Sequence, residues 1–210
     1  MTGSAFADAV LVGVLGLLIG SFLNVVIHRL PRMMERQWAA ECAQYAEDAG
    51  LPTQGGAAPT EQPFNLLTPR SRCPSCGHEV RWYENIPVLS YLALRGRCSG
   101  CGTRIGVRYP LVELATAALF YACALRWGWS FTTLAWCGFC AALVALALID
   151  WDTTLLPDDI TLPLLWAGLL ASVLRWIDVQ PVDAVIGAAA GYVSLWLVYW
   201  GFKLATGKEG

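Results

Sequence analysis

Apolar residues occur along this chain in long blocks that polar segments separate. A helix needs about 17–25 apolar residues to cross the hydrocarbon core of a bilayer, and five blocks are about that long. The pattern therefore predicts an all-α membrane protein with about five transmembrane helices. The predicted helices are Ala5–Ile27, Pro110–Leu125, Phe131–Ile149, Ile160–Trp176 and Ala184–Phe202.

A long polar segment interrupts this pattern after the first block and divides the chain into three parts. Residues 1–31 form the first transmembrane helix, which we expect to close at Pro31. Residues 32–109 form a loop domain, and residues 110–210 form a bundle of four helices. The start of the loop, residues 33–49, favours a further helix with an apolar stripe, which would lie either on the membrane surface or against its own domain.

Composition agrees with a membrane protein, because 56% of the residues are hydrophobic and only 14% are charged, where a soluble domain has about 25%. The net charge of −2 comes without a basic face, so nucleic acid is not expected as a partner. Met1–Asp8 contains neither Lys nor Arg, which a secretory signal peptide would need. The first block is therefore predicted to be a retained helix.

Lys and Arg concentrate in the loop domain and at its two membrane ends. Short basic segments next to transmembrane helices stay in the cytoplasm, so the loop is predicted to be cytoplasmic and the N-terminus periplasmic. Only Arg126 and Arg175 fall on the opposite face. The residues that carry this prediction are Arg29, Arg32, Arg36, Arg95, Arg97, Arg104 and Arg108.

The loop contains two copies of a cysteine knuckle, Cys73-Pro-Ser-Cys76-Gly and Cys98-Ser-Gly-Cys101-Gly. Two thiolates three residues apart converge on one ion, and two such pairs complete the closed four-thiolate shell of a structural zinc site. Two disulfides are the alternative, which a reducing cytoplasm disfavours. We therefore predict a zinc ribbon over about residues 70–105, with His78 outside the shell. The other four cysteines are interpreted as small packing residues: Cys42, Cys123, Cys137 and Cys140.

An acidic turn follows the third predicted span, with four of the chain's sixteen acids. Asp158 and Asp159 suit the start of a helix. Asp150 and Asp152 lie at the end of one, where the macrodipole disfavours negative charge, so one of the two is a functional candidate. Two polar residues within the spans, Asn24 and Glu113, are better explained by bonds to another helix or by snorkelling to the membrane surface than by a functional role.

The ordered motifs of the chain resemble the type IV prepilin peptidases, the membrane enzymes of pilus assembly and type II secretion. The resemblance covers nearly the whole chain. It is carried by Gly20–Pro31 (GSFLNVVIHRLP), the first knuckle, Asn85–Pro87, Ser90–Tyr91, Gly96–Cys98, Tyr109–Glu113 (YPLVE), Ile149–Asp150 with Leu156–Asp158, and Phe202–Gly210 (FKLATGKEG).

The resemblance implies a bifunctional enzyme of the bacterial inner membrane. Such enzymes cut the leader from prepilins and pseudopilins on the cytoplasmic face, and then methylate the new N-terminus with S-adenosylmethionine. The peptidase is of the aspartic type, and its first aspartate matches Asp150 rather than Asp152. The residues that would bind the methyl donor are not identified.

The chain departs from the family at one point. The second catalytic aspartate of the family lies in a Gly-x-Gly-Asp motif after the segment that matches Gly207–Gly210, and the 210 residues contain no such motif. We therefore expect the chain to be truncated and inactive by itself. The alternatives are a non-catalytic, membrane-anchored zinc ribbon that docks prepilins or assembly partners, and a small transporter, which the order of motifs disfavours.

Overall fold

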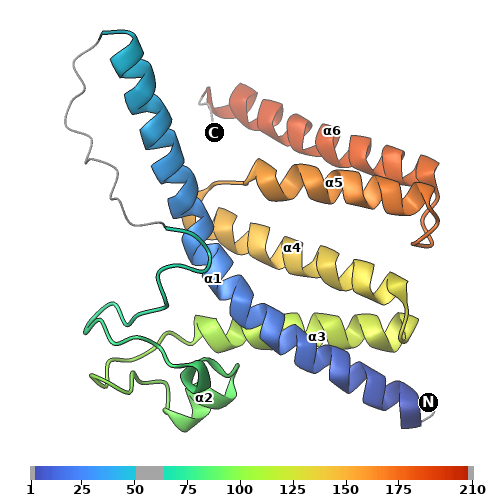
Figure 1. The fold of residues 1–210 in the computed structure, drawn as a ribbon. Coiled ribbons are helices and arrows are strands. Elements are labelled where there is room, and N and C mark those ends of the chain that lie inside the picture. The colour runs from blue at the N-terminus through green and yellow to red at the C-terminus, as the bar shows by residue number, and fades with distance from the viewer. Residues whose placement is uncertain (1–2, 51–63, 208–210) are drawn as a thin grey trace. The chain divides into compact units, whose positions relative to one another are not determined.

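The computed structural model describes residues 3–50 and 64–207, and this part of the chain is helical, as predicted (Figure 1). No strand occurs in it, and the chain divides into two compact units, Met1–Pro157 and Asp158–Gly210. The first unit contains the long helices α1 (Gly3–Asp48), α3 (Arg108–Trp127) and α4 (Phe131–Thr153), with the short elements η1 (Trp82–Asn85) and α2 (Leu89–Ala93). The second contains α5 (Asp158–Val173) and α6 (Pro181–Thr206).

The core of the first unit lies between α1, α3 and α4. Helix α1 packs chiefly against α3, and α4 contacts both, as Figure 1 also shows. The close approach of α1 and α3 requires glycine at Gly20, where a Cβ atom would lie 2.7 Å from the Cα atom of Glu113. The buried residues that hold the three helices together are Ala9, Val12, Phe120, Cys123, Ala124 and Cys137.

The long helices occur where the five apolar blocks predict them. Within the described residues, three are both long and apolar enough to cross a bilayer: α1, α4 and α6. Helix α5 has only 16 residues, and α3 begins with Arg108 in its first turn. A membrane protein is therefore confirmed, whereas the number of five spans stays a prediction.

Helix α1 does not end at Pro31, as the sequence analysis expected, but continues to Asp48. A proline lacks the N–H that would bond to the carbonyl four residues before it, here Ile27, and a long helix tolerates the loss of one bond. The apolar part of α1 nevertheless ends near this point. In the polar extension Trp38, Cys42 and Tyr45 are exposed, so the packing role expected for Cys42 is wrong.

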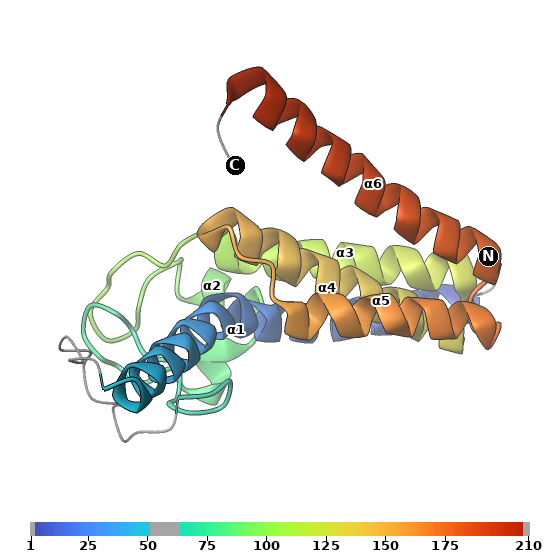
Figure 2. The same ribbon diagram turned by 90° about the horizontal axis from the view of Figure 1, so that it is seen from above.

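The second unit is a pair of helices, and Figure 2 shows α5 and α6 diverging from the turn that joins them. The Ser172 hydroxyl donates a hydrogen bond to the carbonyl of Val179 at 2.7 Å, which fixes this turn. Asp158 and Asp159 lie in the first turn of α5, as expected. Their negative charge there interacts favourably with the helix dipole.

Candidate metal centre and acidic turn

The two cysteine knuckles fold in the same way. In each, the first cysteine donates its N–H to the carbonyl five residues later, and its own carbonyl accepts the N–H of the glycine four residues later. Those glycines, Gly77 and Gly102, have φ values of +73° and +72°, in the region that favours glycine. An isolated antiparallel bridge closes each knuckle, Arg72 with Glu79 and Arg97 with Arg104.

This backbone brings the four cysteine sulfurs together, as the sequence predicts. The Sγ atoms of Cys73, Cys76, Cys98 and Cys101 all lie within 4.8 Å of one another. The Sγ–Sγ distance is 3.8 Å between Cys73 and Cys101, and 3.9 Å between Cys76 and Cys98. A tetrahedral zinc ion with Zn–S bonds of about 2.3 Å needs sulfurs about 3.8 Å apart, so the cluster fits such an ion.

A network of polar side chains joins the two knuckles beside this cluster. The Ser99 hydroxyl lies 2.6 Å from Glu84 Oε1 and 3.1 Å from His78 Nε2, and the same His78 nitrogen lies 3.1 Å from Glu84 Oε2. The backbone N–H of Arg81 and the Ser99 hydroxyl donate to Glu84 and lower its pKa to about 2. His78 thus lies beside the cluster and is held there by Glu84 and Ser99.

The thiols of the cluster favour the ionised form unequally. Hydrogen bonds from the Thr103 hydroxyl and then the Thr103 backbone lower the pKa of Cys101 to about 6. Backbone N–H groups of Ser75 and Cys76 lower the pKa of Cys73. Because thiolates, rather than thiols, bind metals, the lowered pKa values of Cys101 and Cys73 favour a bound cation, whereas the Cys101 side chain raises the pKa of Cys76 to about 12.

Two polar residues of the helices attach the loop domain to the membrane helices. Glu113 is 7% exposed, and it accepts a hydrogen bond of 2.8 Å from the backbone N–H of Val88 at the start of α2. Val88 has a φ of +58°, a strained value for a β-branched residue. Asn24 of α1 donates to the carbonyl of Tyr109 in α3, at 3.1 Å. Asn24 thus makes the expected bond to another helix, whereas Glu113 bonds to the loop domain at the start of α2.

The acidic turn lies at the C-terminal end of α4. Asp152 forms an ion pair with Arg108 at the start of α3, with an N–O distance of 2.7 Å. Asp150 is exposed, and within the described residues its carboxylate has no hydrogen-bond or ion-pair partner. The turn and the loop domain therefore lie at the same end of the first unit, because Arg108, where the loop domain joins α3, pairs with Asp152.

Sequence reasoning missed the partner of Asp152, for which it found no structural benefit. The signal was present only in part, since Arg108 lies just before the second apolar block, Pro110–Leu125. A pairing across 44 positions depends on the packing of α3 against α4, which residue spacing does not show. The structure separates the two carboxylates: Asp152 is neutralised by a cation, and Asp150 is open to solvent.

These features define a helical membrane protein that carries a four-cysteine ribbon and a carboxylate turn at one end of its helices. Residues 14–127 match the family model described as the bacterial peptidase A24 N-terminal domain, and residues 137–210 match the type IV leader peptidase family. The chain belongs to the type IV leader peptidase family. Membership and the three membrane-capable helices place it in the bacterial inner membrane.

Curated relatives are similar over nearly the whole chain. A prepilin leader peptidase/N-methyltransferase of Burkholderia pseudomallei (strain 1026b) is 52% identical over 210 residues, 100% of this chain and 65% of the relative. Proteins of the same name are 54% identical in Aeromonas hydrophila, over 95% of this chain and 67% of the relative, and in Pseudomonas putida, over 94% and 65%. The chain thus spans about 65% of the length of such relatives. No solved structure matches it.

Proposed function

We propose that this protein is an intramembrane aspartic endopeptidase that removes the leader of type IV prepilins and pseudopilins on the cytoplasmic face. Asp150 would supply one of its two catalytic carboxylates. The observation that carries the proposal is the open Asp150 carboxylate at the end of α4, at the same end of the first unit as the ribbon. Family membership and the names of the relatives support it.

The contacts of the two aspartates favour Asp150 over Asp152. The Arg108 guanidinium pairs with Asp152 at 2.7 Å, so this carboxylate is already engaged by a cation. Asp150 is free to face a second carboxylate. Two carboxylates close together share one proton, so that one activates a water molecule while the other protonates the leaving amine. The family resemblance places that partner in a Gly-x-Gly-Asp motif, which residues 1–210 do not contain.

We further propose that the four-cysteine cluster binds one zinc ion, with Cys73, Cys76, Cys98 and Cys101 as ligands. The sulfur spacing and the closed shell of four thiols support a structural ion. Such a shell has no open position for water or substrate. Zinc would hold the two knuckles together and would not take part in peptide cleavage.

The names of the relatives also support N-methylation of the new N-terminus, with S-adenosylmethionine as methyl donor. This second activity is a proposal for the same protein, and the residues that would hold the donor are not assigned. The donor would supply an electrophilic methyl group to the amine that cleavage exposes.

The basic ends of the loop domain support a cytoplasmic ribbon and a periplasmic N-terminus. Cys42 provides a native probe, because it is exposed on the polar extension of α1. We expect an impermeant thiol reagent to leave Cys42 unmodified in intact spheroplasts and to modify it in inverted vesicles. Modification from the periplasmic side would reverse the topology and separate Asp150 from its substrate.

The activity is tested with two proteins in the same membranes. One is the chain of residues 1–210. The other is this chain completed with the part of the Burkholderia pseudomallei relative that the alignment leaves uncovered. We expect the completed protein to shorten a prepilin, seen as a mobility shift, and residues 1–210 to leave it uncut, because one carboxylate cannot act as both base and acid. Cleavage by residues 1–210 alone would contradict the two-aspartate mechanism. A completed protein that binds prepilin without cutting it would favour the docking function.

A further inference from the structure

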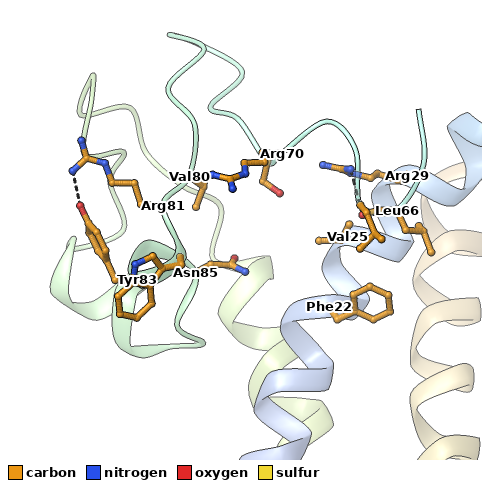
Figure 3. A pocket seen from close by; sticks show the side chains of 12 residues that line it. Phe22, Val25, Arg29, Leu66, Arg70, Val80, Arg81, Tyr83 and Asn85 are labelled. Carbon is orange, nitrogen blue, oxygen red and sulfur yellow. Dashed lines mark hydrogen bonds between the residues drawn. The ribbon is translucent and has the colours of Figure 1, made fainter. Parts of the chain in front are cut away.

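A pocket of about 520 Å³ lies in the first unit between α1 and the loop domain. Phe22, Val25 and Arg29 line it from α1, where their spacing of three and four residues places them on one face of the helix. Residues of the segments 66–71 and 80–83, together with Asn85, form the other walls. Figure 3 shows Phe22, Val25 and Arg29 in this order along α1, with Phe22 toward the apolar part of the helix. The Arg70 side chain lies on the Arg29 side of Val25.

The charge of this pocket is entirely positive. Arg29, Arg70 and Arg81 line it, and no carboxylate does. Within the described residues, none of these three arginines forms an ion pair. Arg29 is only 8% exposed, and its guanidinium donates to the carbonyls of Asn65 and Leu66 at 3.0 and 3.3 Å, which satisfies N–H groups without neutralising the charge. The Arg81 guanidinium donates to the Tyr83 hydroxyl at 2.6 Å, which also leaves its charge in place. A pocket lined by three guanidinium groups and by no carboxylate favours an anion.

The rest of the lining is apolar and lies at the level where the membrane part of α1 ends. Phe22 and Val25 belong to the last apolar turns of this helix, and Arg29 begins the basic segment. Leu67 and Trp82 also line the pocket, and they are 83% and 82% exposed. Trp side chains favour the headgroup level of a membrane. The occupant therefore needs an anionic head and an apolar tail.

We propose that this pocket binds the phosphate headgroup of an anionic membrane phospholipid, with its acyl chains along Phe22 and Val25. Basic pockets beside transmembrane helices on the cytoplasmic side recognise such headgroups. The pocket disfavours cations, among them the methyl donor, which has a sulfonium and an ammonium group, and the basic leader of a prepilin. The proposal depends on the membrane location of α1 and not on the peptidase activity.

The test compares two double variants of residues 1–210 that lose the same charge. Arg70→Ala/Arg81→Ala removes two guanidinium groups from the pocket and keeps the buried Arg29. Arg97→Ala/Arg104→Ala removes two exposed arginines of the second knuckle, outside the pocket. Native mass spectrometry of detergent-solubilised protein titrated with phosphatidylglycerol or phosphatidylcholine measures the retained lipid. Circular dichroism and metal content confirm that each variant is folded.

We expect the wild type to retain about one phosphatidylglycerol and little phosphatidylcholine. The pocket variant should bind phosphatidylglycerol about tenfold or more weakly, because each arginine near a lipid headgroup contributes about 1 kcal/mol. The control variant should change binding by about twofold or less. An equal loss in both variants, or no preference for phosphatidylglycerol, would overturn the proposal.

A second comparison distinguishes a lipid from a free phosphate. Val25→Trp fills the apolar side of the pocket and leaves all three arginines in place. We expect it to lower phosphatidylglycerol binding, and we expect sn-glycerol 3-phosphate, which has no acyl chains, to compete poorly with the lipid in the wild type. Full competition by sn-glycerol 3-phosphate at matched concentration would assign the pocket to a soluble anion and contradict the lipid proposal.

Discussion

The four-cysteine cluster and the acidic turn differ in how much of each is encoded locally. Two six-residue knuckles, each folded by its own backbone hydrogen bonds, supply every sulfur of the cluster. The acidic turn acquires its chemistry from a distant residue, since Arg108 neutralises Asp152 and leaves Asp150 open. A metal shell is therefore visible in a sequence, whereas the role of a carboxylate depends on which cation packs against it.

Removal of one cysteine should have the largest effect, because each ligand is a quarter of the shell. We expect Cys98→Ser to lose the bound metal, from about one zinc ion per chain to almost none, and to loosen the loop domain. Cys42→Ser is the matched control, since Cys42 is exposed and lies outside the cluster. Elemental analysis of the purified proteins measures the difference.

Retention of zinc by the Cys98→Ser protein would contradict the proposed ligand set. A wild-type protein that contains no metal while its thiols are reduced would contradict the centre itself. Both the Cys98→Ser protein and a metal-free wild type should still insert their membrane helices, because insertion depends on the apolar segments and not on the knuckles.

A smaller effect should come from the attachment of the loop domain at Glu113. A hydrogen bond contributes about 0.5–1.5 kcal/mol, and Glu113→Ala would also leave the strained Val88 N–H without its acceptor. We expect the thermal midpoint in detergent to fall by several degrees, at about 2–4 °C per kcal/mol for a chain of this size. Glu113→Gln keeps a hydrogen-bond acceptor, so its thermal midpoint should fall less than that of Glu113→Ala. Equal midpoints for wild type and Glu113→Ala would show that this bond does not hold α2.

The Arg108–Asp152 pair should contribute least to stability, because both side chains are partly exposed. Such pairs contribute about 0.2–1 kcal/mol. We expect Arg108→Gln and Asp152→Asn each to lower the midpoint slightly, and the double variant to lower it by no more than the larger single change. Strictly additive losses would show that the two residues do not interact.

The sequence predicted the helices and the four-cysteine cluster, because both follow from local spacing. It was wrong about the end of the first helix, since Pro31 removes one hydrogen bond without stopping α1. It could not predict the contacts Glu113–Val88 and Arg108–Asp152, which join positions 25 and 44 residues apart. Such contacts depend on how α1, α3 and α4 pack, and this packing is set by residues such as Gly20 that carry no chemistry of their own.

The central claim, that Asp150 is a catalytic carboxylate and Asp152 is not, is tested most directly by prepilin cleavage in the completed protein. Initial rates of Asp150→Asn and Asp152→Asn are compared with wild type at equal protein amounts. We predict that Asp150→Asn lowers the rate by at least about 10²–10⁴-fold, as the loss of an acid–base partner does, while Asp152→Asn keeps much of it because an amide oxygen still accepts from Arg108. Full cleavage by Asp150→Asn, with loss of cleavage in Asp152→Asn, would contradict the assignment.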